Sequence, residues 1–171
     1  MKAVWNRIHA WLDANAPKGY GHLRPGATAE AIQAAEKALG LKLPADVKAS
    51  YRIHDGQRTE PGLIGGEGWC LLSLREMVKT WRRWSRHDRA FARRVPVAWG
   101  GAGDYIFVDL SADAEEPGRV IVQRIDTDDP DPVASSFRSW LEGFAEQLED
   151  DEFAYSEDHD EIMYVDEIDL D

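Results

Sequence analysis

Few residues in this chain have types and spacings that could do chemistry, and the first candidates are imidazoles beside carboxylates. His54 is followed by Asp55, and His87 by Asp88. A carboxylate can orient an imidazole as a general base, but adjacent residues on a helix point in different directions. No Gly-x-Ser-x-Gly elbow or cysteine motif accompanies either pair, and the single cysteine, Cys70, has apolar neighbours. We therefore predict no catalytic residues and no enzyme.

A run of acidic residues follows at Asp126, Asp128, Asp129 and Asp131. It is similar in spacing to a calcium loop, but it lacks the glycine of the sharp turn and the distal glutamate that an EF-hand requires. An acidic turn is the simpler interpretation, and a loose surface cation site stays open. We predict no bound metal and no cofactor.

The strongest charge signal lies at the C-terminal end. Residues 142–171 contain 14 Asp and Glu and no Lys or Arg, whereas residues 1–141 contain 20 Lys and Arg and 18 Asp and Glu. Such an acidic block attracts a basic partner and repels nucleic acid. The predicted partner-binding residues, with the Asp126–Asp131 loop as a second edge, are Asp150, Asp151, Glu152, Tyr155, Asp158, Asp160 and Tyr164.

Two interpretations of this tail remain open. Phe153, Tyr155, Ile162 and Tyr164 are more apolar than a purely disordered acidic tail would carry. The tail is then either a solvated extension that docks in part on the body, or an acidic arm that mimics nucleic acid and occupies the basic cleft of a partner.

A basic counterpart is expected on the clearest helix, which begins at Ser73 with the capping-box spacing to Glu76. Along it, four arginines recur at helical spacing on a face apart from the tryptophans: Arg82, Arg86, Arg89 and Arg93. Contact with nucleic acid is one interpretation of this face, although the net charge of −12 opposes it. Attraction of the chain's own tail, or of an acidic strip on a partner, fits better.

Patterns elsewhere predict the elements that position these residues. Helices are predicted over Lys2–Ala14, from Thr28 to a stop at Gly40, from Pro44 to a stop at Gly56, and from Ser135 or Ser136 onward. Strands are predicted over Val95–Trp99, Tyr105–Leu110 and Arg119–Ile125, with loops over residues 15–26 and 126–132. The short connections favour antiparallel pairing. We predict an α+β fold, a twisted and mostly antiparallel sheet flanked by helices.

Length and composition agree with a single core. Residues 1–148 are expected to form one domain, with residues 149–171 as an acidic C-terminal extension. One cysteine excludes an internal disulfide, and no run is long enough to cross a bilayer. We expect a soluble, cytoplasmic protein without membrane contact.

The order of several motifs resembles a known family. Leu39 to Asp46 reads Leu-Gly-Leu-Lys-Leu-Pro-Ala-Asp and is followed by Tyr51 and by His54-Asp55-Gly56. This order resembles the E..LG..LP.D...fy..H.G core of the SUKH superfamily, which contains yeast cell-wall regulators of the Smi and Knr type and many bacterial immunity proteins. The resemblance extends from about Trp5 to Leu148, through features such as Pro96–Gly103 and Ser136-Phe137.

The resemblance implies a SUKH-like domain that binds proteins and does no catalysis. On this reading the chain is an immunity protein that neutralises a basic, nuclease-like or deaminase-like bacterial toxin by occluding its active site. Three alternatives stay open: a regulatory scaffold of the yeast type, an enzyme that brings distant His and acidic residues together, and a nucleic-acid binder using the arginine face. The sequence does not define the toxin or the oligomeric state.

Overall fold

The computed structural model describes residues 1–58, 62–63, 68–100, 103–111, 116–127, 129–156, 158 and 161–168. In chain order the elements are α1 (Lys2–Asn15), α2 (Pro17–Tyr20), α3 (Ala29–Leu39), α4 (Ala45–Tyr51), β1 (Cys70–Leu71), α5 (Leu74–His87), the 3₁₀ helix η1 (Arg89–Arg93), β2 (Arg94–Trp99), β3 (Tyr105–Asp109), β4 (Val120–Gln123), β5 (Asp131–Ala134), α6 (Phe137–Glu149), β6 (Phe153–Ser156), β7 (Glu161–Tyr164) and α7 (Val165–Ile168).

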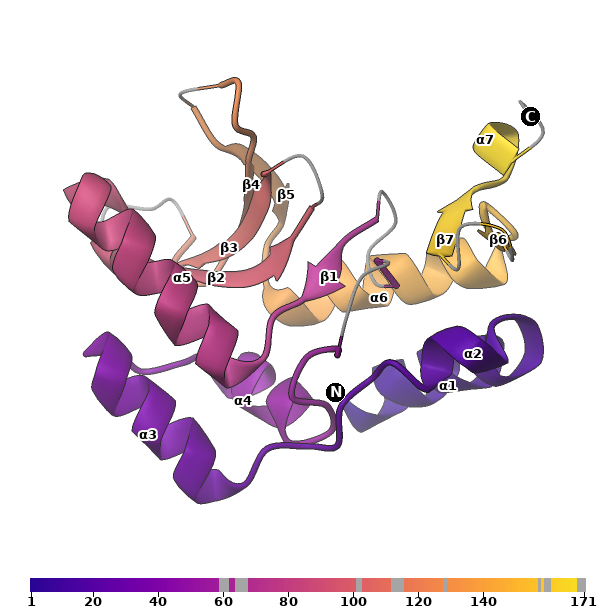
Figure 1. Cartoon of the computed structure of the whole chain (residues 1–171), viewed down its shortest axis with the longest axis horizontal. Helices are drawn as coiled ribbons and strands as arrows, with labels where there is room; N and C mark the ends of the chain where they lie inside the picture. Colours follow the sequence, from indigo (N-terminus) through magenta and orange to yellow (C-terminus); the bar gives the residue numbers. More distant parts are fainter. Residues whose placement is uncertain are drawn as a thin grey trace.

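A curved sheet forms the centre of the molecule (Figure 1). Its strand order is β1-β2-β3-β4-β5, and every neighbouring pair is antiparallel. Ile106 of the central strand lies opposite Ala98 on one side and Val122 on the other. The register of β2 shifts between Pro96 and Ala98, where a proline without a backbone donor is tolerated. The α+β class with an antiparallel sheet is confirmed.

Both faces of the sheet are covered, which explains why β3 is buried along its whole length. Side chains alternate between the faces of a strand, so Ile106 joins the main core, while Phe107 joins a smaller aromatic cluster. In that cluster Phe107 packs against Phe91 of η1 and Trp84 of α5. Helix α5 and η1 therefore cover one face, and the main core fills the other.

Local sequence signals define the helix ends. Thr28 accepts a hydrogen bond from the Ala31 amide at the start of α3, and Gly40 ends that helix in the left-handed conformation. Ser73 and Glu76 form the expected capping box on α5. Of the two serines considered for α6, Ser136 is the cap.

Three expectations about local structure need correction. The predicted loop over residues 126–132 runs into β5, which pairs at the edge of the sheet through Asp131 and Pro132. The predicted loop over residues 15–26 contains the single turn of α2. Helix α4 ends at Tyr51, well before Gly56, because the chain turns there to meet β1 and α5.

Candidate functional site

The acidic C-terminal segment is a folded part of the body. Strands β6 and β7 pair from Phe153 opposite Tyr164 to Ser156 opposite Glu161. Phe153 and Ile162 are buried in the main core, and the Phe153 ring lies 5.7 Å from Phe144 of α6. The described residues of the tail therefore dock on the body, as the first of the two interpretations expects. We call residues 149–156, 158 and 161–168 the acidic unit.

Several described carboxylates of the acidic unit are exposed to solvent. Asp150, Asp151, Glu152 and Asp158 are exposed, and Asp160 lies outside the described residues. Asp151 has a φ of 57°, a left-handed conformation that aspartate tolerates better than most residues. Two aromatic residues predicted for the same site, Tyr155 and Tyr164, are half-buried. The structure thus places three of these residues on the hairpin, Tyr155, Asp158 and Tyr164, and three directly before it, Asp150, Asp151 and Glu152.

A pocket of about 300 Å³ lies where the acidic unit meets α1. Trp11 and Asn15 of α1 line it together with Asp151, Tyr155 and Val165. Val165 is 41% exposed, so an apolar group stands open beside the carboxylates. Aromatic and apolar side chains ringed by polar ones are the usual composition of the centre of a protein interface.

The second predicted acidic edge lies elsewhere. Asp126, Asp129 and Asp131 are exposed at the connection between β4 and β5, and Asp128 lies outside the described residues. In Figure 1 this connection and the acidic unit occupy different parts of the molecule, so the two acidic sets do not form one site. No group of three or more His, Cys, Asp or Glu residues suited to a metal ion occurs among the described residues.

The glutamate of the E..LG..LP.D pattern, Glu36, has a structural role. Its side chain is buried, and its carboxylate accepts hydrogen bonds from the Leu43 amide at 2.9 Å and from Lys42 Nζ at 3.1 Å. Burial alone would raise the pKa of Glu36, but these hydrogen bonds and the charge of Lys48 outweigh it and hold the pKa below its ordinary value. Glu36 therefore fixes the turn between α3 and α4.

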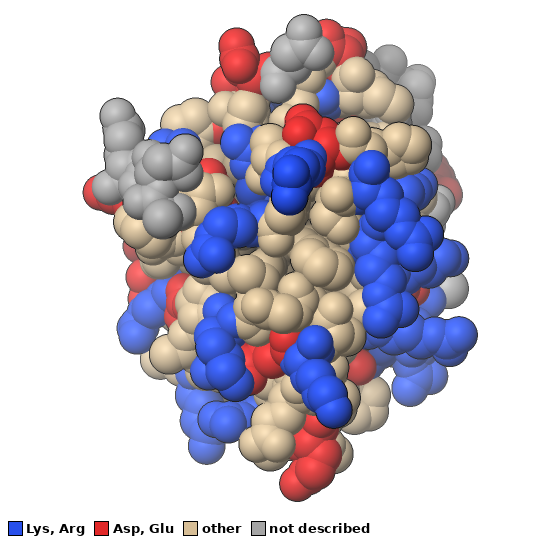
Figure 2. Space-filling view, turned by 90° about the vertical axis from the view of Figure 1, so that its left-hand side faces the viewer, with Lys and Arg blue, Asp and Glu red and all other residues tan. Residues whose placement is uncertain are grey.

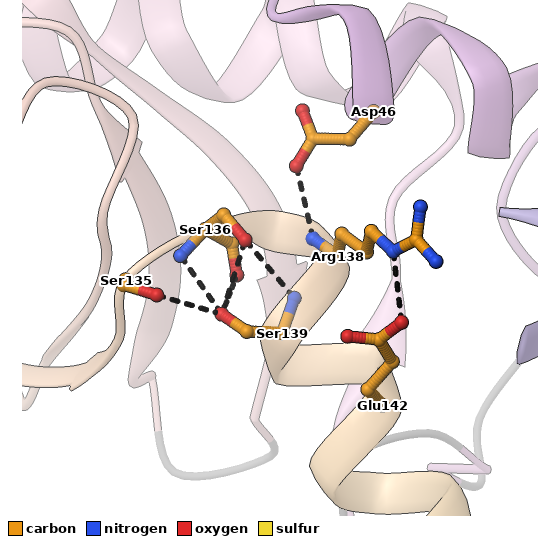
Figure 3. Close-up of polar contacts among 6 residues, drawn as sticks. All are labelled: Asp46, Ser135, Ser136, Arg138, Ser139 and Glu142. Carbon is orange, nitrogen blue, oxygen red and sulfur yellow. Dashed lines mark hydrogen bonds and ion pairs between the residues drawn. The ribbon is translucent and has the colours of Figure 1, made fainter.

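The aspartate of the same pattern caps a helix far away in the chain (Figure 3). Asp46 Oδ2 accepts a hydrogen bond from the backbone amide of Arg138 at 2.9 Å, in the first turn of α6. The Ser136 hydroxyl accepts a hydrogen bond from the Ser139 amide of the same turn at 3.0 Å. A carboxylate at a helix N-terminus also meets the positive end of the helix dipole. Asp46 thus joins α4 to α6.

The tyrosine and the His-Asp-Gly end of the pattern hold the chain against α5. Tyr51 Oη donates to the Leu72 carbonyl at 2.8 Å, and Asp55 Oδ1 accepts from the Leu74 amide at 2.7 Å. Gly56 has a φ of +68°, and a Cβ there would lie 2.5 Å from the Leu72–Ser73 backbone. Glu36, Asp46, Tyr51, Asp55 and Gly56 of the pattern therefore all hold parts of the fold together.

His54 makes a contact that the sequence did not reveal, with His9 of α1. Their Nε2 atoms are 2.7 Å apart, and His54 Nδ1 donates to the Arg24 carbonyl at 2.8 Å. Because a carbonyl only accepts, the hydrogen of neutral His54 is on Nδ1, and His54 Nε2 accepts a hydrogen bond from His9 Nε2. Burial lowers the pKa of both imidazoles, and the neighbouring His54 lowers that of His9 further, against an opposing effect of Asp13.

We predict that the protein loses stability on mild acidification because of this histidine pair. An unfolded chain binds protons near pH 6.5, whereas the folded pair resists them, so the free energy of unfolding falls as pH drops below 6.5. Urea unfolding at pH 7.5 and pH 5.5 measures the loss. His9→Gln supplies a side-chain amide donor that does not titrate. It should therefore reduce the dependence of the unfolding free energy on pH. An unchanged slope in that variant would contradict the assignment.

The four predicted arginines do not form one continuous face. Helix α5 ends at His87, and Asp88 accepts a hydrogen bond from the Ala90 amide to begin η1. Arg82 and Arg86 line a groove beside α3, whereas two others line a separate pocket with Asp109, namely Arg89 and Arg93. Asp88 acts as a cap, which accounts for the His87-Asp88 pair.

The single cysteine lies in the central sheet. Cys70 is buried in β1 and receives a contact from Gln57 Nε2 at 3.4 Å.

Across the described ranges, no helix has the length and apolar character needed to cross a membrane.

Comparison with known proteins identifies relatives of this scaffold. The family model described as SMI1 / KNR4 family (SUKH-1) matches residues 26–143. F-box only protein 3 of Homo sapiens is 39% identical over 66 residues, which cover 38% of this chain and 14% of that protein. A glucan synthesis regulatory protein of Neurospora crassa is 32% identical over 94 residues, covering 53% of this chain and 17% of that protein.

A third relative aligns with nearly the whole chain. The cell wall biosynthesis/cell cycle regulator smi1 of Schizosaccharomyces pombe is 28% identical over 199 aligned positions, covering 94% of this chain and 38% of that protein. The chain thus spans between about a seventh and two fifths of the length of these relatives. The family model covers more than half of the chain, including Glu36, Asp46 and Gly56, whose structural roles are described above. The chain belongs to the SMI1/KNR4 family (SUKH-1).

Proposed function

We propose that this protein is a non-enzymatic binding module whose acidic unit engages a basic protein, as an immunity protein engages a toxin. The observation that carries the proposal is the docked hairpin, in which Phe153 and Ile162 are buried while the neighbouring carboxylates are exposed. A folded hairpin presents these charges without the entropy that a disordered arm loses on binding. The partner is a nuclease-like or deaminase-like toxin whose basic active site the unit occludes.

The negative charge and the pocket would contribute to different steps of binding. The negative potential of residues 142–171 accelerates encounter with a basic surface, and dissolved salt screens this attraction. The pocket beside Val165 and Tyr155 then receives an apolar or aromatic side chain of the partner, which sets the lifetime of the complex.

A regulatory scaffold is the second candidate function. The relatives named as a glucan synthesis regulatory protein and as a cell wall biosynthesis/cell cycle regulator favour it. A regulatory function of this kind would not require catalysis by this chain. The same acidic unit would then hold a signalling partner without inhibiting it, so the activity of the captured protein distinguishes the two functions.

We predict that Val165→Arg abolishes capture of the partner. The substitution places a cation beside the pocket, where it repels a basic surface, and Val165 is exposed enough that the fold is retained. Affinity should fall at least about tenfold, enough that the partner is no longer retained through the washes. Tagged protein is incubated with extract of the organism that encodes the chain, and retained proteins are identified by mass spectrometry after low-salt and high-salt washes.

Two further variants make the test specific. Val133→Arg changes the charge equally on β5, beside the second acidic edge, where valine is 48% exposed. Gln33→Arg changes it on α3, away from both acidic sets. A basic protein captured by the wild type and by Gln33→Arg, lost with Val165→Arg, and stoichiometrically inhibited by the purified chain supports the immunity function. Capture without inhibition favours the scaffold, and equal capture by all variants contradicts the assigned surface.

A further inference from the structure

A groove of about 820 Å³ runs between α3 and α5, on a different face from the acidic unit. Its floor consists of small or apolar side chains, namely Ala31, Ala34, Ala35, Ala38, Leu74 and Val78. Figure 2 views the molecule from the side that carries these two helices. It shows Lys and Arg side chains on both sides of an area without charge.

The basic wall of the groove comes from a single helix. Its members recur along α5 as Arg75, Lys79, Arg82, Arg83 and Arg86. Arg83 donates to Tyr105 Oη at 2.9 Å. No ion pair joins the other four to a carboxylate within the described residues, although the whole chain holds 32 Asp and Glu.

This arrangement costs the free protein stability. Like charges four residues apart on a helix repel, and the wall contains three such pairs: Arg75 with Lys79, Lys79 with Arg83, and Arg82 with Arg86. The nearest carboxylates, Asp55 in the groove and Glu76 on α5, bond the Leu74 amide and Ser73 instead of the wall. A row of cations without ion pairs, beside an apolar floor, is matched by a ligand that supplies both acidic and apolar groups.

The apolar floor restricts the class of ligand that fits the groove. Nucleic acid would neutralise the wall, but its backbone offers nothing apolar for Ala34 or Val78, and the protein's net charge of −12 repels it. An amphipathic helix supplies both kinds of group. Its apolar side chains form one stripe, and its carboxylates lie beside that stripe. The small side chains at Ala31, Ala34, Ala35 and Ala38 follow helical spacing, so they allow the backbone of a third helix to approach closely.

We propose that the groove between α3 and α5 binds an acidic amphipathic helix of a partner protein. The apolar stripe of that helix lies on the alanines of α3, and its carboxylates pair with Arg75, Lys79, Arg82 and Arg86. The groove is a second binding surface, opposite in sign to the acidic unit. The two surfaces would let one chain hold a basic and an acidic partner together.

The test uses a synthetic peptide as the probe and the full chain as the receptor. The peptide is about 18 residues long, long enough to form helix, with Leu and Ala at the i, i+3, i+4 and i+7 positions and Glu beside them. A second peptide carries Lys in place of each Glu, and a third scrambles the acidic sequence. Fluorescence anisotropy at low salt should show saturable binding of the acidic amphipathic peptide alone.

Matched variants locate the binding site. Ala34→Glu adds a negative charge inside the groove, while Gln33→Glu adds the same charge to the adjacent residue of α3, outside its lining. The first should weaken binding at least about tenfold and the second should not. Arg82→Glu should weaken binding similarly while leaving the melting temperature unchanged or raised, because it removes the repulsion from Arg86. This combination separates lost binding from lost folding.

Four outcomes would overturn the proposal. Equal affinity of Ala34→Glu and the wild type places the peptide elsewhere. Equal binding of the acidic and scrambled peptides shows charge attraction without a groove. Tighter binding of duplex DNA, lost with Arg82→Glu but retained by Ala34→Glu, assigns the wall to nucleic acid. Self-association in light scattering that disappears with Ala34→Glu assigns the groove to a second copy of the chain.

Discussion

Gly56→Ala is expected to lower the free energy of unfolding by about 3–4 kcal/mol, a large fraction of the stability of a domain this size. Gly56 has a φ of +68°, which costs a residue with a Cβ about 1 kcal/mol. The new methyl would also lie 2.5 Å from the backbone of Leu72 and Ser73, where α5 begins, and backbone atoms there have no room to shift cheaply. Thermal unfolding should show a fall in melting temperature of about 10 °C.

Gly40 provides the matched control for this prediction. It has nearly the same φ, +67°, but nothing lies within 4 Å of a Cβ built there. Gly40→Ala should therefore cost only the backbone term of about 1 kcal/mol. The difference in unfolding free energy between the two variants measures the steric cost of placing a methyl group against the start of α5. Equal losses in the two variants would show that the close approach at Gly56 contributes nothing to stability.

Phe153→Ala is expected to destabilise the protein by about 3–5 kcal/mol and to release the acidic unit. The Phe153 ring is buried between Phe144 at 5.7 Å and Tyr164 at 4.5 Å, so its loss leaves a cavity at the junction of β6 and α6. Denaturant unfolding gives the loss in stability, and limited proteolysis locates it through earlier cleavage after Leu148.

The same variant also tests the proposed function. No exposed carboxylate is changed, so the net charge is constant while the order of the hairpin is lost. Capture of the basic partner should weaken because the released segment must be ordered again on binding. Phe153→Leu, which refills most of the volume, should restore both stability and capture. Full capture by a released tail would mean that charge alone, without the hairpin, forms the interface.

Elements with short-range signals could be predicted from the sequence. The cap and stop of α3 rest on Thr28 and Gly40, and the start of α5 rests on the reciprocal pair Ser73 and Glu76, each within one turn. The strands β2, β3 and β4 likewise follow β-rich runs. The sheet was predictable because its strands are consecutive and their connections are short.

The missed or undecided elements had weak local signals. Strand β5 contains Asp131 and Pro132, which indicate a turn, and it is stabilised by its partner β4 at the sheet edge. The hairpin of the acidic unit does alternate, with Phe153 and Tyr155 on one strand and Ile162 and Tyr164 on the other. Its dense charges nevertheless suited a solvated tail equally well, and packing on α6 decides between the two.

The candidate surfaces depend on contacts that no local pattern contains. The arginines of α5 were visible, but the alanine floor that makes a groove of them belongs to α3. The break between α5 and η1 at Asp88 divides what looked like one face. Similarly, His9 and His54 meet across 45 positions of sequence. Tertiary packing, and not helical or strand periodicity, creates these sites.

The hydrogen bond from the Arg138 amide to Asp46 joins residues 92 positions apart, and this separation affects how the chain is made. During synthesis α3 and α4 leave the ribosome before α6 is made. Asp46 therefore lacks its hydrogen-bond donor, the Arg138 amide, while the strands of the sheet are synthesised. Until α6 arrives, its apolar residues Phe137, Leu141 and Phe144 are missing from the core. The main core is therefore completed only after residues 137–149 have been synthesised and packed against α4.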